Sequence, residues 1–241
     1  MQAVVVTDVK KSFLVGNQII PVLKGIDFSI NHGEFAIIFG PSGSGKSTLL
    51  HTILGLEKPT AGSVKMLDKD LYSNMNEDQR STYRKTHVGM VYQQANWVKS
   101  VDVVTNVALP LMLLGEEKEI RIKKAKQALE MLKMHDWAHH HPSELSSGQQ
   151  QKVSVARALI TDPEIIIADE PTGNLDFESG IELMEILKKL SKTLNKTVLM
   201  VTHDLGYLKY ADKAVKVIDG IIANNINKNE LMSKFKKEVK F

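Results

Sequence analysis

Short apolar runs separated by polar turns dominate the chain, and their periods predict alternating strands and helices. Strand-like runs occur at 3–9 ("AVVVTDV"), 25–30 ("GIDFSI") and 34–40 ("EFAIIFG"), and again at 62–71, 88–93, 164–169, 197–202 and 213–219. The runs "EIIIAD" and "TVLMVT" are apolar almost throughout, as expected for parallel strands covered on both faces. Helical patterns lie between the strands at 46–54, 76–86, 147–160 and 180–194. The alternation predicts an α/β fold with a mainly parallel sheet.

Between residues 95 and 144 the pattern is helical, with no strand pattern nearby. "EEKEIRIKKAKQALEMLKM" places apolar residues at helical spacing among charges, namely Ile120, Ala125, Ala128, Leu129 and Leu132. We therefore predict a helical insertion (95–144) in an α/β core formed by 1–94 and 145–220. The remaining residues, 221–241, are predicted to be a basic C-terminal tail, and its end, "NKNELMSKFKKEVKF" (227–241), to be helical or frayed.

The segment "GPSGSGKST" (40–48), which we call the phosphate loop, joins an apolar strand to a helix. Glycines let successive N–H groups point at one anion, and the helix N-terminus adds its amides and its positive dipole end. Gly40, Gly45, Lys46 and Ser47 match G-x-x-x-x-G-K-[ST] at every fixed position. This mechanism places Lys46 on the β- and γ-phosphates of a nucleoside triphosphate and the Ser47 hydroxyl on Mg²⁺. A flexible Gly/Ser turn before a helix is the alternative.

All nine residues of the phosphate loop are candidate ligands for the phosphates. They are Gly40, Pro41, Ser42, Gly43, Ser44, Gly45, Lys46, Ser47 and Thr48.

A pair of acids follows the apolar strand "EIIIAD" in the segment 164–171. The carboxyl ends of parallel strands border the crevice in which open α/β sheets bind ligands. We expect Asp169 to hold Mg²⁺ through water, and Glu170 to face the γ-phosphate and polarise the attacking water. An ordinary solvated strand end is the alternative.

A second segment of small residues before a helix is "LSSGQQQ" (145–151), which we call the serine–glycine segment. Ser146 is a natural N-cap, and the amides of Ser147, Gly148 and Gln149 can face outward as another anion site. Taken alone, the segment could simply be a capped helix.

Composition limits the range of functions. The 241 residues include no cysteine, which excludes disulfides and thiolate metal sites. A net charge of +3 is too mild to indicate nucleic acid by itself. The longest apolar stretch, 101–115, is interrupted by Asp102, Asn106 and Pro110 and is too short to span a bilayer.

The four motifs "GPSGSGKST", "LSSGQQQ", "IIIADEPTGNLD" and "VTHD" resemble, in order and approximate spacing, those of the ATP-binding-cassette (ABC) ATPases. The resemblance covers roughly residues 4–220. It implies a P-loop NTPase core, an antiparallel β subdomain on the N-terminal side and an inserted helical subdomain. It also implies a Mg²⁺-dependent ATPase with ATP as its substrate.

The resemblance assigns roles to further residues. Gln93 is similar to the residue that links Mg²⁺ and the attacking water to a neighbouring membrane subunit, and His203 to a histidine on the γ-phosphate. Asp176 resembles a position that crosses a dimer interface. Phe13 falls where the family stacks an aromatic ring on adenine, although a buried Phe at a strand end is the alternative.

The family geometry implies two copies arranged head to tail, with each ATP between one copy's phosphate loop and the other copy's serine–glycine segment. One departure stands out, because Ser147 occupies the first glycine of the family's Leu-Ser-Gly-Gly-Gln pattern. If that position has a positive φ, the serine is strained; if not, its hydroxyl could add a donor.

"NVALPL" (106–111), the "QQQ" run and "ADEPTGNLD" resemble a subgroup that serves lipoprotein release, macrolide export, antimicrobial-peptide resistance and cell division. This resemblance implies a separate membrane permease, received by the helical insertion and the surface near Gln93, and a place on the cytoplasmic face of the membrane. Trp97 is then a docking contact, or alternatively covers the insertion's own core.

Other interpretations carry less support from the sequence. A soluble ABC ATPase acting on nucleic acid or ribosomes is the alternative function, but the chain has neither a second cassette nor a basic-aromatic stripe, so no nucleic acid is expected. "HDWAHHH" (135–141) could bind zinc if its histidines converged, and Lys234, Lys236, Lys237 and Lys240 could rest on anionic lipid or remain solvated.

Overall fold

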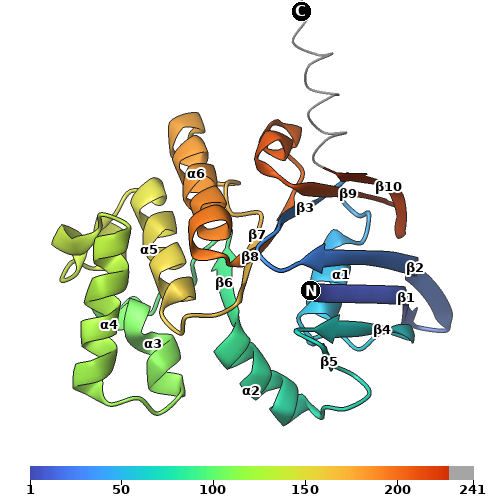
Figure 1. Ribbon diagram of the computed structural model, residues 1–241, viewed down its shortest axis with the longest axis horizontal. Coiled ribbons are helices and arrows are strands. Elements are labelled where there is room, and N and C mark those ends of the chain that lie inside the picture. Colours follow the sequence, from blue (N-terminus) through green and yellow to red (C-terminus); the bar gives the residue numbers. More distant parts are fainter. Residues whose placement is uncertain (228–241) are drawn as a thin grey trace, which may run out of the picture. The chain divides into compact units, whose positions relative to one another are not determined.

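The computed structural model describes residues 1–227, and the chain divides into two compact units (Figure 1). The first unit comprises Met1–Ser81 and Lys188–Phe241, and the second comprises Thr82–Leu187. Two helices contribute residues to both units, α2 (Glu77–His87) and α6 (Phe177–Leu194).

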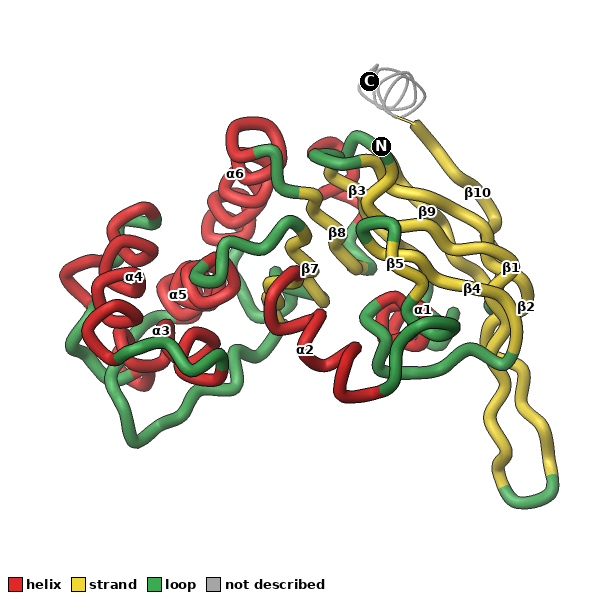
Figure 2. The backbone as a smooth tube through the Cα atoms, turned by 60° about the horizontal axis from the view of Figure 1, so that its bottom comes forward, coloured by secondary structure: helices red, strands yellow, loops and turns green. Residues whose placement is uncertain are grey.

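Four antiparallel strands open the first unit and form one sheet in the order β2-β1-β4-β5. They are β1 (Gln2–Val15), β2 (Gln18–Asn31), β4 (Ala61–Met66) and β5 (Lys69–Asp70). The end of the β1–β2 hairpin projects beyond β4, because β4 pairs with β1 only as far as Lys10 (Figure 2). This sheet is the antiparallel subdomain that the family resemblance implied.

The run 62–71, predicted as one strand, is two strands in the structure. Leu67 and Asp68 have φ values of 47° and 64°, and they turn the chain between β4 and β5. Tight hairpin turns need such left-handed backbone at both central residues, which Asn-Gly or Asp-Gly pairs adopt most easily. The Leu-Asp pair lacks that pattern, so the sequence did not mark the turn.

The second sheet of the first unit has the strand before the phosphate loop at its centre. β3 (Phe35–Phe39) pairs in parallel with β8 (Thr197–Thr202) and β9 (Lys213–Ile218). Every residue of β3 and β8 is buried, as the run "TVLMVT" predicted for β8 as a parallel strand covered on both faces. α1 (Lys46–Ile53) follows β3 and packs against β2, β4 and β8, and a short helix, η3 (Leu205–Tyr210), follows β8.

The predicted C-terminal tail begins with a strand. β10 (Ile221–Asn227) pairs antiparallel with β9 through a turn in which Asp219 and Gly220 have φ values of 48° and 78°. Asp-Gly is a strong hairpin signal, so the sequence did contain a marker for β10. Residues 228–241, which include the four tail lysines, lie outside the described part of the chain.

The second unit joins a parallel strand pair to a group of helices. β6 (Val88–Tyr92) pairs with β7 (Ile165–Asp169), and α5 (Ser147–Leu159) packs on β6. α3 (Val103–Leu113), α4 (Lys118–Met131) and α5 pack against one another (Figure 1). Two short helices, η1 (His135–Trp137) and η2 (Pro142–Glu144), complete the predicted insertion.

The apolar spacing of the insertion identifies most of its core. Ala125, Ala128, Leu129 and Leu132 are buried, whereas Ile120 is 41% exposed and belongs to the surface of α4. Asn106 is fully buried, and its amide donates to the carbonyl oxygens of Val98, Val101 and Asp102 at 3.0 to 3.1 Å. This asparagine fixes the loop that enters α3, and nothing in the apolar pattern predicts it.

Candidate functional site

The phosphate loop lies in the first unit, between β3 and α1, as predicted. Gly40 has a φ of 153°, and a Cβ built on it would lie 2.0 Å from the carbonyl oxygen of Val217. Gly45 has a φ of 98° and is the N-cap of α1, with no side-chain hydrogen bond capping the helix. Only glycine fits at position 40. At position 45, glycine has no side chain to cap the backbone amides at the start of α1.

Lys46 is only 7% exposed, and its ammonium lies within the curve of the loop. The Nζ atom donates to the carbonyl oxygens of Gly40 at 2.9 Å and Pro41 at 2.8 Å. The Ser44 hydroxyl is also buried and forms no hydrogen bond. A buried cation, a buried hydroxyl without a partner and a helix start that no side chain caps fit an anion such as the phosphates of ATP.

His203 lies next to the phosphate loop. A pocket of about 230 Å³ in the first unit is lined by Phe39, Gly40, Pro41, His203, Leu205 and Lys216. The structure therefore brings together the loop and the histidine predicted to contact the γ-phosphate. Lys216 was not among the predicted residues; it pairs in register with Phe39, a long-range relation that the sequence does not contain.

Phe13 lies near the end of the β1–β2 hairpin. Its ring is half-buried, faces the Lys11 ammonium at 4.8 Å, and pairs across the hairpin with Ile20. Neighbouring Leu14 and Ile19 are both 73% exposed. Phe13 is therefore only half-buried, and its role beside adenine stays a prediction.

In the second unit, the acid pair ends β7. Asp169 is the last residue of the strand, and Glu170 has a φ of 47°. Gly173 N–H donates to the Glu170 carbonyl oxygen at 3.1 Å and closes a tight turn. Non-glycine residues in this left-handed conformation are uncommon and are concentrated at functional sites. Oxygen donors such as Ser47 and Asp169 are the ligand type that Mg²⁺ prefers.

Gln93 contacts the turn that follows the acid pair. Its Nε2 atom donates to Asn174 Oδ1 at 3.5 Å, and Asn174 Nδ2 donates to the Gln93 carbonyl oxygen at 3.4 Å. A Cβ on Gly173 would lie 2.6 Å from Gln93 Nε2. The structure thus places Gln93 against the turn that follows Glu170, through Asn174, a residue that the sequence analysis missed.

The serine–glycine segment forms the start of α5. Ser146 is the N-cap: its hydroxyl accepts from Gln149 N–H at 3.3 Å, and Gln149 Oε1 accepts from Ser146 N–H at 2.8 Å. Ser147 is the first helical residue and has no positive φ. The strain considered for Ser147 is therefore absent, because the position does not require the left-handed conformation.

Gly148 does have a structural requirement for glycine. A Cβ at this position would lie 2.7 Å from Ser179 Oγ on α6. Ser179 in turn donates to Asp176 from its backbone N–H at 2.8 Å and from its hydroxyl at 2.9 Å. These two hydrogen bonds lower the pKa of the exposed Asp176 carboxyl. The structure thus joins three predicted site residues, Gly148, Gln149 and Asp176, in one local framework.

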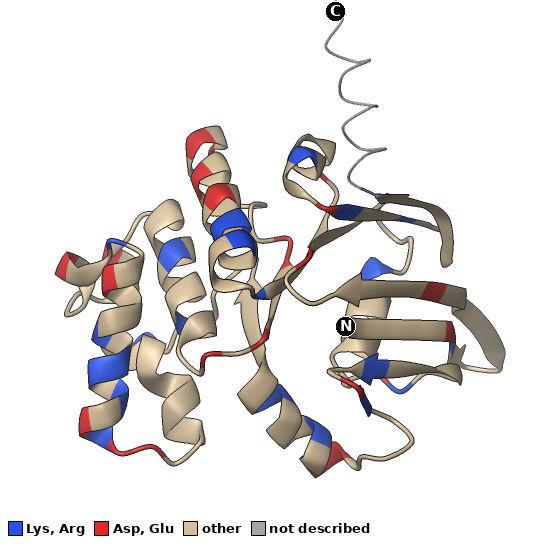
Figure 3. Ribbon diagram, in the orientation of Figure 1, with Lys and Arg blue, Asp and Glu red and all other residues tan. Residues whose placement is uncertain are grey.

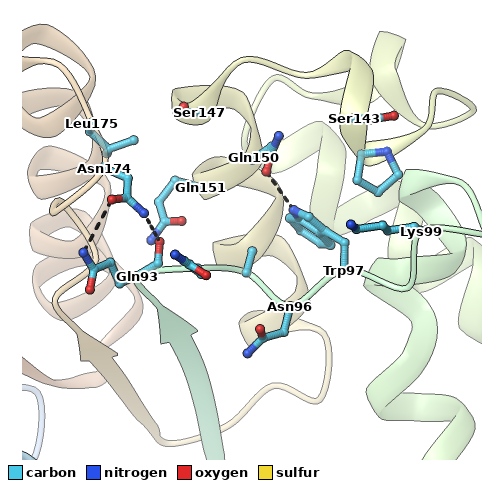
Figure 4. A pocket seen from close by; sticks show the side chains of 13 residues that line it. Gln93, Asn96, Trp97, Lys99, Ser143, Ser147, Gln150, Gln151, Asn174 and Leu175 are labelled. Carbon is cyan, nitrogen blue, oxygen red and sulfur yellow. Dashed lines mark hydrogen bonds between the residues drawn. The ribbon is translucent and has the colours of Figure 1, made fainter.

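A pocket of about 600 Å³ lies beside this framework in the second unit (Figure 4). Trp97 enters the pocket wall, and its indole Nε1–H donates to Gln150 Oε1 at 3.0 Å. The Arg157 guanidinium lies 4.6 Å from the centre of the Trp97 ring, and burial lowers the pKa of this arginine. Trp97 thus contacts α5, and its ring is half-buried. The other side chains that line the pocket include Gln93, Lys99, Ser147, Gln151, Asn174 and Leu175.

The histidines of 135–141 face different partners. His135 approaches Glu130 at 3.5 Å, His139 approaches Asp102 at 3.4 Å, and the His140 ring lies 4.8 Å from that of Trp137. Within residues 1–227, no three potential metal ligands gather in one place. The histidine run therefore does not form the convergent set that zinc requires.

Within the described residues, none of the helices has the length and apolar character needed to cross a membrane.

Comparisons with known proteins agree with this geometry. A family profile described as "ABC transporter" matches residues 23–173. An uncharacterized ABC transporter ATP-binding protein of Methanocaldococcus jannaschii is 46% identical over 206 residues, which cover 86% of this chain and 91% of that protein. The macrolide export ATP-binding/permease protein MacB of Bartonella henselae is 40% identical over 93% of this chain, but this chain spans only 34% of MacB.

Solved structures show the same fold. The ATP-binding cassette MJ0796, solved as a dimer in a post-hydrolysis state with ADP and Pi, has a TM-score of 0.84 and 38% identity, covering 93% of this chain and 98% of that one. CbiO1 from Clostridium perfringens, part of the ABC transporter complex cbiONQ, has a TM-score of 0.87 and 26% identity, covering 98% of this chain and 92% of that one. The P-loop fold, the phosphate loop and these matches together show that the chain belongs to the ABC transporter family, as an ATP-binding ATPase subunit.

Proposed function

We propose that this subunit hydrolyses ATP to drive a separate membrane permease in export, in lipoprotein or lipid extraction, or in resistance to peptide antibiotics. The observation that carries the ATP site is the buried Lys46 ammonium in the phosphate loop, at a helix start that no side chain caps. The choice of export follows the similarity to MacB, whose name describes macrolide export.

In the proposed chemistry, each candidate site residue has one task. Lys46 and the amides at the start of α1 bind the β- and γ-phosphates, and His203 contacts the γ-phosphate from the adjoining pocket. Glu170 accepts a proton from water as that water attacks the γ-phosphorus, and the bond to the β-phosphate oxygen breaks to release ADP.

Ser47, Asp169 and Gln93 would hold Mg²⁺, and the bound cation neutralises phosphate charge. All three side chains offer oxygen donors, which suits a hard cation. Gln93 already contacts the turn that follows Glu170, so it is suited to orienting groups near that glutamate.

Two copies of the chain would share each ATP. We propose that the phosphate loop of one copy holds the nucleotide while Ser146, Ser147, Gly148 and Gln149 of the other copy approach the γ-phosphate, with Asp176 at the interface. The cassette MJ0796, which was solved as a dimer, supports the pairing of two copies. Binding energy from the shared γ-phosphate would then hold the dimer closed, and hydrolysis would release it.

The permease would dock on the second unit, near the loop that follows Gln93 and near the helical insertion. This places the subunit at the cytoplasmic face of the membrane through its partner. Action on nucleic acid is not favoured, because the net charge is only +3, and α6 carries its acidic side chains in its first half and its basic ones in its second half (Figure 3).

The direct test measures phosphate release by the purified chain with ATP and Mg²⁺, with Lys46→Ala as the control. We expect Mg²⁺-dependent hydrolysis that EDTA abolishes, and roughly tenfold to hundredfold weaker ATP binding by Lys46→Ala, because a charge-assisted contact is lost. Equal ATP binding by Lys46→Ala would contradict the assigned site. Purification of the tagged chain from detergent-solubilised membranes would then identify the permease.

A further inference from the structure

Two hydrogen bonds attach the loop that follows β6, residues 93–99, to α5. Just before the loop, Gln151 Nε2 donates to the carbonyl oxygen of Tyr92, the last residue of β6, at 2.9 Å. Within the loop, Trp97 Nε1–H donates to Gln150 Oε1 at 3.0 Å (Figure 4). Both glutamines lie in the first turns of α5, so the loop is tied to the part of the helix that begins with the serine–glycine segment.

Arg157 strengthens this attachment from further along the same helix. Gln150 and Arg157 are seven residues apart, which is two helical turns, so they lie on one face of α5. The guanidinium covers the Trp97 ring at 4.6 Å and donates to the carbonyl oxygens of Ala95 and Asn96. We call Trp97, Gln150 and Arg157 the indole clamp.

The indole clamp also reaches the residue before the N-cap of α5. Gln150 Nε2 donates to the Leu145 carbonyl oxygen at 3.1 Å, while its Oε1 atom accepts the Trp97 indole. One side chain therefore bonds both the loop and the chain that enters the serine–glycine segment. A displacement of Trp97 would act on Leu145 through a single amide group.

We propose that Trp97 is a positioning residue that, through Gln150, couples movement of the loop 93–99 to the serine–glycine segment. The effect of this coupling on ATP rests on the proposed function. There, a partner that shifts the loop would reorient the serine–glycine segment, which completes the ATP site of the neighbouring copy. Trp97 acts on the segment by its bond to Gln150 and not by contact with ATP.

The first test measures amide hydrogen exchange in the nucleotide-free protein, in peptides that cover 94–99 and 145–149. Trp97→Phe removes the indole donor but keeps an aromatic ring, and Gln150→Leu removes the acceptor. We expect both variants to speed exchange roughly threefold to tenfold in both segments together, since each loses about one hydrogen bond. Faster exchange in 94–99 alone would overturn the coupling.

Two matched variants control this experiment. Trp137→Phe changes the chain's only other tryptophan, which is also half-buried but lies against His140 in η1, and it should leave both segments unchanged. Gln150→Glu keeps an acceptor oxygen for the indole and should restore parental exchange in 94–99. If Gln150→Glu behaves like Gln150→Leu there, the Trp97–Gln150 bond is not the link.

The second test measures ATP-dependent dimerisation in a Glu170→Gln background. Trp97→Phe should raise the dimer dissociation constant roughly threefold to tenfold without changing ATP affinity or the melting temperature, and the Trp97→Phe/Gln150→Leu double variant should be no weaker than Gln150→Leu alone. Unchanged dimerisation, or additive losses, would overturn the proposal. If the Glu170→Gln parent itself does not dimerise with ATP, the proposed function is wrong, and the exchange experiment still decides whether the clamp couples the two segments.

Discussion

The starts of α1 and α5 are two helix N-termini that the sequence presents as anion sites, yet they are built differently. α1 begins at Gly45, which has left-handed backbone and no capping side chain, and Lys46 lies buried beside it. α5 begins at Ser146, whose side chain and that of Gln149 already bond each other's backbone N–H groups. At the start of α1, the backbone donors and a cation are available to a ligand. At the start of α5, side chains of the same helix start already accept from two of the backbone donors.

This difference assigns the two sites different tasks. A buried ammonium and uncapped amides can bind a phosphate without help, because the charge and the donors are already in place. The start of α5 has no basic residue in its first turn and a capping box, so it binds an anion weakly alone. It is suited to contact a phosphate that a second copy already holds.

Among the variants that distinguish the tasks of these two helix starts, Glu170→Gln is expected to have the largest effect on ATP hydrolysis. The variant should bind ATP normally and lose about a hundredfold or more in hydrolysis, because the group that accepts the proton from water is gone. Light scattering with ATP should show a dimer accumulating. A monomer that hydrolyses ATP at the parental rate would show that Glu170 has another role.

A smaller effect is expected for Gly148→Ala. Its added Cβ would lie 2.7 Å from Ser179 Oγ, so the Ser179 hydroxyl must turn away from Asp176, or the start of α5 or of α6 must shift. We expect about a tenfold loss of hydrolysis with ATP affinity unchanged, since a shifted donor misses its partner. Combining it with Ser179→Ala should restore part of the activity. A loss of ATP affinity instead would mean that this segment binds nucleotide within its own copy.

A modest, pH-dependent effect is expected for Asp176→Asn. Ser179 bonds hold the pKa of Asp176 below its usual range, so the carboxylate stabilises the fold above the unfolded-state pKa, and this contribution is lost as pH falls through the lowered value. Thermal melts should therefore show a small deficit for Asp176→Asn at pH 7 that disappears in strong acid. A deficit that grows in acid would contradict the assignment.

The smallest effect is expected for Ser147→Gly. Ser147 has ordinary helical backbone, so glycine relieves no strain and only adds flexibility at the first helical residue. Hydrolysis should stay within about twofold of the parent, and the melting temperature should not rise. A clear gain in hydrolysis would show that the serine restrains the approach of this segment to ATP.

The sequence predicted what local rules determine. "TVLMVT" became β8 with the predicted bounds, and the glycines of the phosphate loop marked both its turn and the start of α1. Asp219-Gly220 would also have marked the β9–β10 turn. These features depend on residues a few positions apart, for which apolar period and turn preference suffice.

The relations that the sequence did not predict are long-range. Trp97 meets Gln150 across 53 residues, and Gln93 meets Asn174 across 81. Each bond depends on how separate elements pack, and no spacing rule reports that packing. The prediction that Ile120 belongs to the core of the insertion is wrong for a related reason. Helical spacing alone does not say which face of α4 is covered.

The most direct test of the shared ATP site mixes two impaired variants, Lys46→Ala, which should bind ATP weakly, and Gly148→Ala, which should bind ATP but hydrolyse it slowly. A mixed dimer would combine the intact phosphate loop of the Gly148→Ala copy with the intact serine–glycine segment of the Lys46→Ala copy. We expect the mixture to hydrolyse ATP well above the sum of the two separate rates. A mixture whose rate equals that sum would contradict the claim that two copies complete each site.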